Sequence, residues 1–138
     1  MSFLLDTNVV SEVARPRPDK AVLAWFDSVA DQQLYLSVLS VGEIRKGIER
    51  LPAGKRRTEL GSWLEDTLPA WFGARLLPID AAVAARWGRL LAASPRSLPA
   101  IDSLLAATAL THNLSLVTRN VSDFDVPDLN VVNPWRLR

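Results

Sequence analysis

The feature that most constrains the fold is a series of short apolar runs separated by longer stretches with helical periodicity. The runs cover residues 3–5, 34–36, 76–79, 114–117 and 131–132. Each run is short and almost free of polar residues, which is typical of strands covered on both faces of a parallel sheet. The pattern therefore predicts five buried strands.

Between these runs, apolar residues recur at spacings of three and four, as they do on the buried face of a helix. The four sets are Val41, Ile44, Ile48 and Leu51; Leu60, Trp63, Leu64, Leu68 and Trp71; Val83, Trp87, Leu90 and Leu91; and Ile101, Leu104, Leu105 and Ala109. Short strands alternating with such helices predict an α/β fold, which we expect to be a three-layer α/β/α sandwich.

Length and composition narrow the class of protein. A chain of 138 residues predicts one domain over residues 1–138. The absence of cysteine excludes disulfides, thiolate metal sites and a cysteine nucleophile, and indicates a reducing compartment. The N-terminus lacks the basic region of a secretory signal, and no apolar run approaches the ~20 residues that span a bilayer. We therefore expect a soluble, cytoplasmic protein.

Four acidic residues follow the predicted strands, where open α/β sheets bind their ligands. Asp6 comes directly after the first run, and Glu43 is expected in the first turn of the helix after the second. Asp102 opens the helix before the fourth run, and Asp123 follows that run. All four side chains are expected at the same edge of the sheet.

Each acid also has a purely structural explanation as a helix cap or first-turn charge. Asp6 is a candidate N-cap, and Ser40 with Glu43 fits a capping box. Asp102 complements a helix dipole, and Asn120 with Asp123 resembles a cap. Capping explains each acid separately, but it does not explain four acids at one edge.

Carboxylates gathered at one site repel one another, so they take up protons or bind a cation. The chain has one histidine, His112, which the sequence places at a helix end, where it complements the dipole. Oxygen ligands without histidine or cysteine favour Mg²⁺ or Mn²⁺. Such a metal, keeping several waters, is typical of phosphodiester hydrolysis.

Four segments in this order resemble the PIN-domain ribonucleases, specifically the VapC and FitB-like toxins of type II toxin–antitoxin pairs. The segments are LLDTNVVSE (4–12), SVGEIRKGIERL (40–51), AIDSLLAATAL (100–110) and LVTRNVSDF (116–124). The resemblance covers essentially the whole chain, and residues 131–135 are similar to the usual C-terminus of that subgroup. It implies a five-stranded parallel sheet in the order 3-2-1-4-5.

By this resemblance, Asp6, Glu43, Asp102 and Asp123 correspond to the acidic quartet that binds Mg²⁺ or Mn²⁺ and activates water. Asp6 and Asp102 are implied as the most direct ligands. The implied activity is that of an endoribonuclease toxin.

The resemblance also assigns supporting residues and partners. Thr118 corresponds to a hydroxyl position that supports the quartet, and Asn8 and Asn120 lie where further polar support is expected. The implied partners are an RNA substrate, a second copy of the chain and an antitoxin. The antitoxin is expected to lie beside the acidic site and to contact Trp63 and Trp71.

Net charge alone does not indicate a nucleic-acid-binding protein, because it is only +1. Six cations nevertheless lie between residues 45 and 57. They form either a solvated helix face or a phosphate-binding strip, in which Arg45, Lys46 and Arg50 are the candidate RNA contacts.

Three alternatives remain open. A phosphorylated receiver domain would use Asp80, after the third run, as its phosphoacceptor, but no lysine follows the fifth run and Asp80 is better explained as an N-cap. A catalytically inactive binding module is opposed by the complete set of acids. A housekeeping RNA-processing nuclease would share all the residues discussed.

Overall fold

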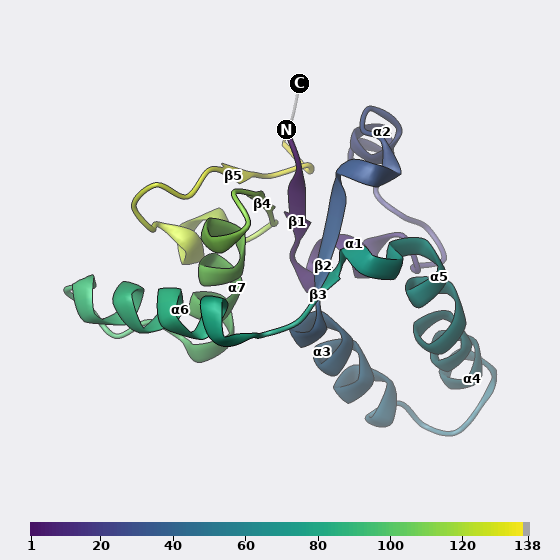
Figure 1. The fold of residues 1–138 in the computed structure, drawn as a ribbon. Coiled ribbons are helices and arrows are strands. Elements are labelled where there is room, and N and C mark those ends of the chain that lie inside the picture. The colour runs from purple at the N-terminus through teal and green to yellow at the C-terminus, as the bar shows by residue number, and fades with distance from the viewer. Residues whose placement is uncertain (137–138) are drawn as a thin grey trace.

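Five short strands form one sheet in which every neighbouring pair runs parallel, in the order β3-β2-β1-β4-β5 (Figure 1). The strands are β1 (Phe3–Leu5), β2 (Leu34–Ser37), β3 (Leu76–Leu77), β4 (Ser115–Val117) and β5 (Val131–Val132). The computed structural model describes residues 1–136, so positions 137 and 138 of the predicted domain lie outside the described residues. The predicted sheet and its strand order are confirmed.

The central strand β1 explains why the apolar runs are uninterrupted. Phe3 and Leu5 belong to one hydrophobic core, and Leu4, between them, belongs to a second core on the opposite face. All three side chains are buried. Because both faces of the strand are covered, a polar residue at any of these positions would lose its contact with water.

Most helices cover the first face of the sheet. They are α1 (Thr7–Glu12), α2 (Lys20–Asp27), α3 (Val38–Glu49), α4 (Lys55–Ser62) and α5 (Leu68–Phe72). A π-helical turn, Trp63–Thr67, joins α4 to α5. The proline in the first turn of α5 has no N–H to donate to the preceding turn, which fits a local departure from α-helical bonding at this join.

Two helices cover the second face. In Figure 1, α7 (Ala100–Thr111) lies beside the sheet, and α6 (Ala81–Ala93) lies outside it, next to α7. The contact between α7 and the sheet uses Leu105 and the small residues Ala106 and Ala109, which allow a close approach. Only Val83 of α6 is fully buried, so much of that helix is exposed.

Several predicted boundaries are wrong by a few residues. The third strand ends at Leu77, because Pro78 has no N–H for the sheet. Helix α3 begins at Val38, with the Ser37 hydroxyl accepting from the N–H of Leu39 at 3.0 Å. Glu43 therefore lies in the second turn rather than the first, and the predicted capping box at Ser40 is wrong.

The expected cap at Asp80 is confirmed, because its side chain accepts from the N–H of Val83 at 3.0 Å at the start of α6. After the end of α7, Asn113 adopts a positive φ of 55°. The apolar face assigned to α7 is wrong at Ile101, which is 37% exposed. Asn120 stands at the start of a short 3-10 helix, Val121–Phe124, but its side chain makes no capping hydrogen bond.

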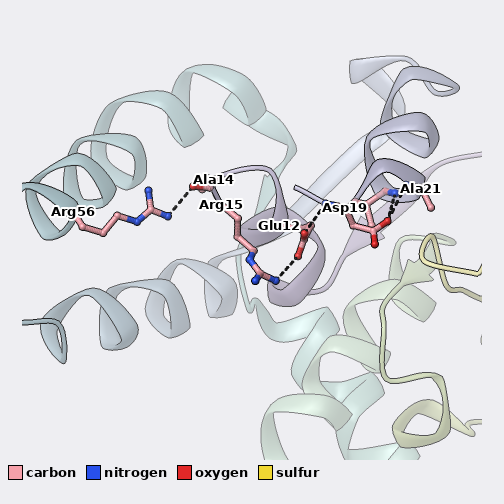
Figure 2. A network of polar contacts seen from close by, with 7 residues as sticks. Glu12, Ala14, Arg15, Asp19, Ala21 and Arg56 are labelled. Atoms are coloured by element: carbon pink, nitrogen blue, oxygen red, sulfur yellow. Dashed lines mark hydrogen bonds and ion pairs between the residues drawn. The ribbon is translucent and has the colours of Figure 1, made fainter. Parts of the chain in front are cut away.

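A buried carboxylate, Glu12, organises the connection between α1 and α2 (Figure 2). It accepts from the backbone N–H of Asp19 at 2.8 Å and pairs with Arg15 at 3.2 Å. Arg56 of α4 donates to the carbonyl of Ala14 at 2.8 Å. Glu12 is therefore fully used in fixing this loop. Among residues 1–136, no helix has the length and apolar character needed to cross a membrane.

Candidate active site

Asp6 lies at the point where the strand order reverses, between β1 and β4. Its backbone N–H donates to the carbonyl of Val117 at 2.8 Å, and its Oδ1 accepts from the N–H of Thr7 at 2.7 Å. Asp6 is therefore the N-cap of α1, as the structural explanation predicted. The side chain is only 8% exposed, and the reversal point of an open α/β sheet is where such folds bind ligands.

The predicted supporting residues gather around Asp6. The hydroxyl of Thr118, fully buried, donates to Asp6 Oδ2 at 2.8 Å and accepts from the backbone N–H of Asn120 at 3.1 Å. Asn8 Nδ2 lies 3.4 Å from the same Oδ2, and Asn8 Oδ1 accepts from the N–H of Arg119 at 3.3 Å. Asn120 thus acts through its backbone rather than its side chain.

Glu43 reaches the site from α3 through a chain of hydroxyl groups. The Thr7 hydroxyl oxygen lies 2.6 Å from Glu43 Oε1 and 2.8 Å from the hydroxyl oxygen of Ser40. Because a hydroxyl has one proton, Thr7 donates to the carboxylate and accepts from Ser40. Thr7 and Ser40 are site residues that the sequence pattern did not predict. Their positions, directly after Asp6 and one helical turn before Glu43, were the available signal.

Asp102 and Asp123 meet on the other side of the site. Asp102 lies in the first turn of α7, as predicted, and Asp123 lies in the short 3-10 helix after β4. Both line one small pocket, which we call the acidic pocket and whose other lining residues are Leu98, Pro99, Ser103, Phe124 and Val126. Burial raises the pKa of Asp102, and the negative charges of Asp123 and Glu43 raise it further.

The electrostatics connect Asp6 to the same group. Burial is the largest cause of its raised pKa, and the charges of Glu43 and Asp102 act in the same direction. Hydrogen bonds from Thr118 and from the N–H of Thr7 oppose this rise. The four predicted acids are therefore close enough for their charges to be coupled.

The residues present fit a hard divalent cation. Within the described part of the chain, no group of three His, Asp or Glu side chains is arranged to hold a metal ion. Mg²⁺, however, is usually bound by one or two carboxylates and keeps several waters. Asp6 and Asp102 are oxygen donors whose charged forms are disfavoured by burial and by neighbouring acids, and a cation would relieve both effects.

The basic strip of α3 is partly occupied by ion pairs. Arg45 lies 2.7 Å from a carboxylate oxygen of Glu65 and 3.7 Å from one of Glu49. These contacts connect α3 to the π-helical turn. Lys46 of α3 and Arg50, the C-cap of that helix, are exposed, and their predicted role in RNA binding stays a prediction.

The fold and the site together define the class of protein, which is an open parallel α/β domain with coupled carboxylates at the reversal point of its sheet. The chain belongs to the PIN domain family, whose model matches residues 3–128. Membership of this family removes the receiver-domain alternative, in agreement with the capping role of Asp80.

Known proteins similar to this chain carry toxin and ribonuclease names. The VapC ribonuclease Y4jK of Sinorhizobium fredii is 43% identical over 137 residues, covering 96% of this chain and 97% of that protein. The toxin FitB of Neisseria gonorrhoeae is 39% identical over 136 residues, covering 96% and 98%. The crystal structure of FitAcB from Neisseria gonorrhoeae superposes with a TM-score of 0.89 at 39% identity, covering 98% of this chain and 99% of that one.

Proposed function

We propose that this protein is a Mg²⁺- or Mn²⁺-dependent endoribonuclease that acts as the toxin of a toxin–antitoxin pair. The observation that carries the proposal is the coupled group of carboxylates at the reversal point of the sheet. The names of the full-length relatives, ribonuclease and toxin, support the choice of RNA as substrate and of toxicity as the biological role.

Asp6 and Asp102 are the residues that would hold the cation. When bound, the cation would activate water and offset the negative charge of the phosphodiester. The hydrogen bonds from Thr118 and from the N–H of Thr7 orient Asp6 and favour its charged form. Hydrolysis adds water across one P–O bond, which breaks to leave a phosphate on one fragment and a hydroxyl on the other.

Glu43 is suited to accepting a proton. Its Oε1 is fixed by the hydroxyl of Thr7, which holds the carboxylate plane in place. The second oxygen, Oε2, is then the one available to take the proton released by the attacking water. Asp123, on the far side of Asp102, completes the negative potential that selects a cation for this site.

A toxin requires a partner that neutralises it, and the site suits an antitoxin that presents an arginine. A guanidinium bonds to a carboxylate through two parallel hydrogen bonds and would compensate the charge of the group without a metal. Trp63 and Trp71, which lie half-buried at the edge of the first core, would supply apolar contacts. A two-fold homodimer and a cytoplasmic location complete the proposal.

The chemical part is tested with purified protein and labelled single-stranded RNA. We expect cleavage with Mn²⁺ or Mg²⁺, none in EDTA, and none by Asp6→Asn. The matched control is Asp27→Asn, which removes an exposed acid of α2 outside the site and should cleave at the parent rate. Undiminished cleavage by metal-stripped protein in EDTA would contradict the proposal.

The biological part is tested by expression in bacteria. We expect growth arrest with the parent chain, no arrest with Asp6→Asn, and rescue by co-expression of the neighbouring reading frame. Harmless expression of a folded, active nuclease would instead favour the RNA-processing alternative.

A further inference from the structure

A cavity of about 570 Å³ lies beside the acidic pocket, between α6, the loop that follows it and the loop after the last 3-10 helix. We call it the α6 cavity. Its volume is in the range of cavities that hold small ligands. Residues Arg86, Arg89, Leu90 and Ala93 of α6 line it at helical spacings of three and four, so one face of this exposed helix forms its wall.

The α6 cavity adjoins the acidic pocket of the candidate active site. Leu98 and Val126 line both the α6 cavity and the acidic pocket that contains Asp102 and Asp123. A polymer with one phosphodiester at the carboxylates would therefore place its next residue at the α6 cavity.

The arginines of the α6 cavity differ in their ion pairing from Arg45 in the basic strip of α3. Arg86, Arg89 and Arg96 line the cavity, and none of the five ion pairs found within residues 1–136 involves them. Asp125 and Asp128 line it as well, and they are exposed. The arginines present donors to an anion, whereas the aspartates present acceptors for N–H groups.

The lining between these charges is mainly apolar. Leu90, Leu98, Leu110, Val126 and Pro127 contribute to it. A single-stranded nucleotide combines the three matching features: an anionic phosphate, a flat apolar base face and polar groups on the base edge. Proteins recognise single-stranded RNA by combining phosphate contacts with base contacts of this kind.

We propose that the α6 cavity is a binding subsite for the nucleotide of single-stranded RNA that flanks the scissile phosphodiester. In this subsite Arg86, Arg89 and Arg96 bind phosphate, the apolar lining contacts the base, and Asp125 or Asp128 accepts from a base amino group. The proposal rests on the proposed ribonuclease function and deepens it. It assigns the principal RNA contact to α6 rather than to the α3 strip.

The test measures RNA binding separately from cleavage. The probe is fluorescein-labelled oligocytidine of about twelve nucleotides, within the usual single-strand site sizes. Binding is followed by fluorescence anisotropy with Mg²⁺, in an Asp6→Asn background that does not consume the RNA. The cavity variant replaces Arg86, Arg89 and Arg96 with Gln. The matched control replaces Arg17, Lys20 and Arg136 with Gln, removing the same charge from exposed positions outside both the α6 cavity and the candidate RNA contacts of the α3 strip.

We expect the cavity variant to weaken binding about tenfold or more, and the control to change it little. Each lost phosphate contact should also reduce the slope of log affinity against log salt by about 0.7, so the cavity variant should lose about 2 in slope. In cleavage assays of the otherwise wild-type protein, the cavity variant should raise KM and largely keep kcat. Asp125→Ala should reduce the preference for oligocytidine over oligouridine, which lacks the amino group.

Three results would overturn the subsite. Equal loss of affinity in the cavity variant and the control would show only general electrostatic attraction. Unchanged RNA binding with a changed mass in sedimentation would assign the α6 cavity to a contact between copies of the chain. Normal cleavage and KM in the cavity variant would refute the subsite alone, whereas absence of both RNA binding and RNA cleavage in the parent protein would refute the proposed function as well.

Discussion

Replacing Thr118 with Val tests whether Asp6 is held in its charged form by the hydrogen bond between these two buried residues. Valine keeps the branched shape of threonine and has a methyl group in place of the hydroxyl. The structure then loses the 2.8 Å bond to Asp6 Oδ2 and leaves the N–H of Asn120 without its 3.1 Å acceptor. A hydrogen bond to a charged group contributes about 1.5–3 kcal/mol.

The direction of the effect with pH follows from the state that the bond stabilises. Because the Thr118 hydroxyl favours ionised Asp6, its loss should raise the pKa of Asp6 further. The loss of stability should therefore grow as the pH rises and Asp6 ionises. It should shrink on acidification, as Asp6 becomes protonated in both proteins.

The assay is a double-mutant cycle of Thr118→Val and Asp6→Asn, measured by denaturant unfolding of the metal-free protein. We expect a coupling of about 1–2 kcal/mol at neutral pH and a smaller value at mildly acid pH. Thr118→Ser, which keeps the donor, is the control and should preserve the coupling. Additive effects of the two substitutions at neutral pH would refute the reasoning.

Three further predictions concern charge. Asp102→Asn should abolish RNA cleavage and raise the Tm of the metal-free protein, because it removes a charge that burial and neighbouring acids disfavour; a lower Tm would contradict this. The free energy of unfolding of the metal-free parent, relative to that of Asp6→Asn, should fall as the pH rises from 3.8 through the raised pKa of Asp6, because the folded state binds the extra proton. Denaturant unfolding measured at a series of pH values would show this fall. A difference that instead rises with pH would be inconsistent with the raised pKa. Glu12→Gln should lower the free energy of unfolding by about 1–3 kcal/mol, because the N–H of Asp19 loses a charged acceptor, while cleavage by the folded protein should stay at the parent rate.

The strands and their trailing acids could be predicted because both are local features of the sequence. The start of α3 could not be predicted, because Ser37 and Ser40 are equally good caps. The choice depends on β2 continuing to Ser37, which pairs with Leu77 of β3. Glu43 still reaches the site from the second turn because the hydroxyl of Thr7, on another helix, donates a hydrogen bond to it.

Long-range contacts account for the remaining differences. Helix α2 was not predicted, since its eight residues bury only Val22 and Trp25 and give too short a periodic pattern. Local charge density makes Arg45 a candidate RNA contact, but its ion-pair partner Glu65 lies 20 positions away and on another element. The spacing of Arg86 and Arg89 places both on one face of α6, but Arg96 joins them only through the path of the loop after α6, which local patterns do not encode.

The hydrogen bond between Asp6 and Thr118 joins residues 112 positions apart, which sets the order in which the site is built during translation. The ribosome delivers Asp6 and Glu43 early, but β4 and Thr118, which follows it directly, emerge only near the end of synthesis. Until β4 docks beside β1, the nascent chain has acids without their fixed geometry. The active site is therefore complete only when the last part of the chain has folded. A partner protein that recognised the early helices would bind the chain before it could cleave RNA.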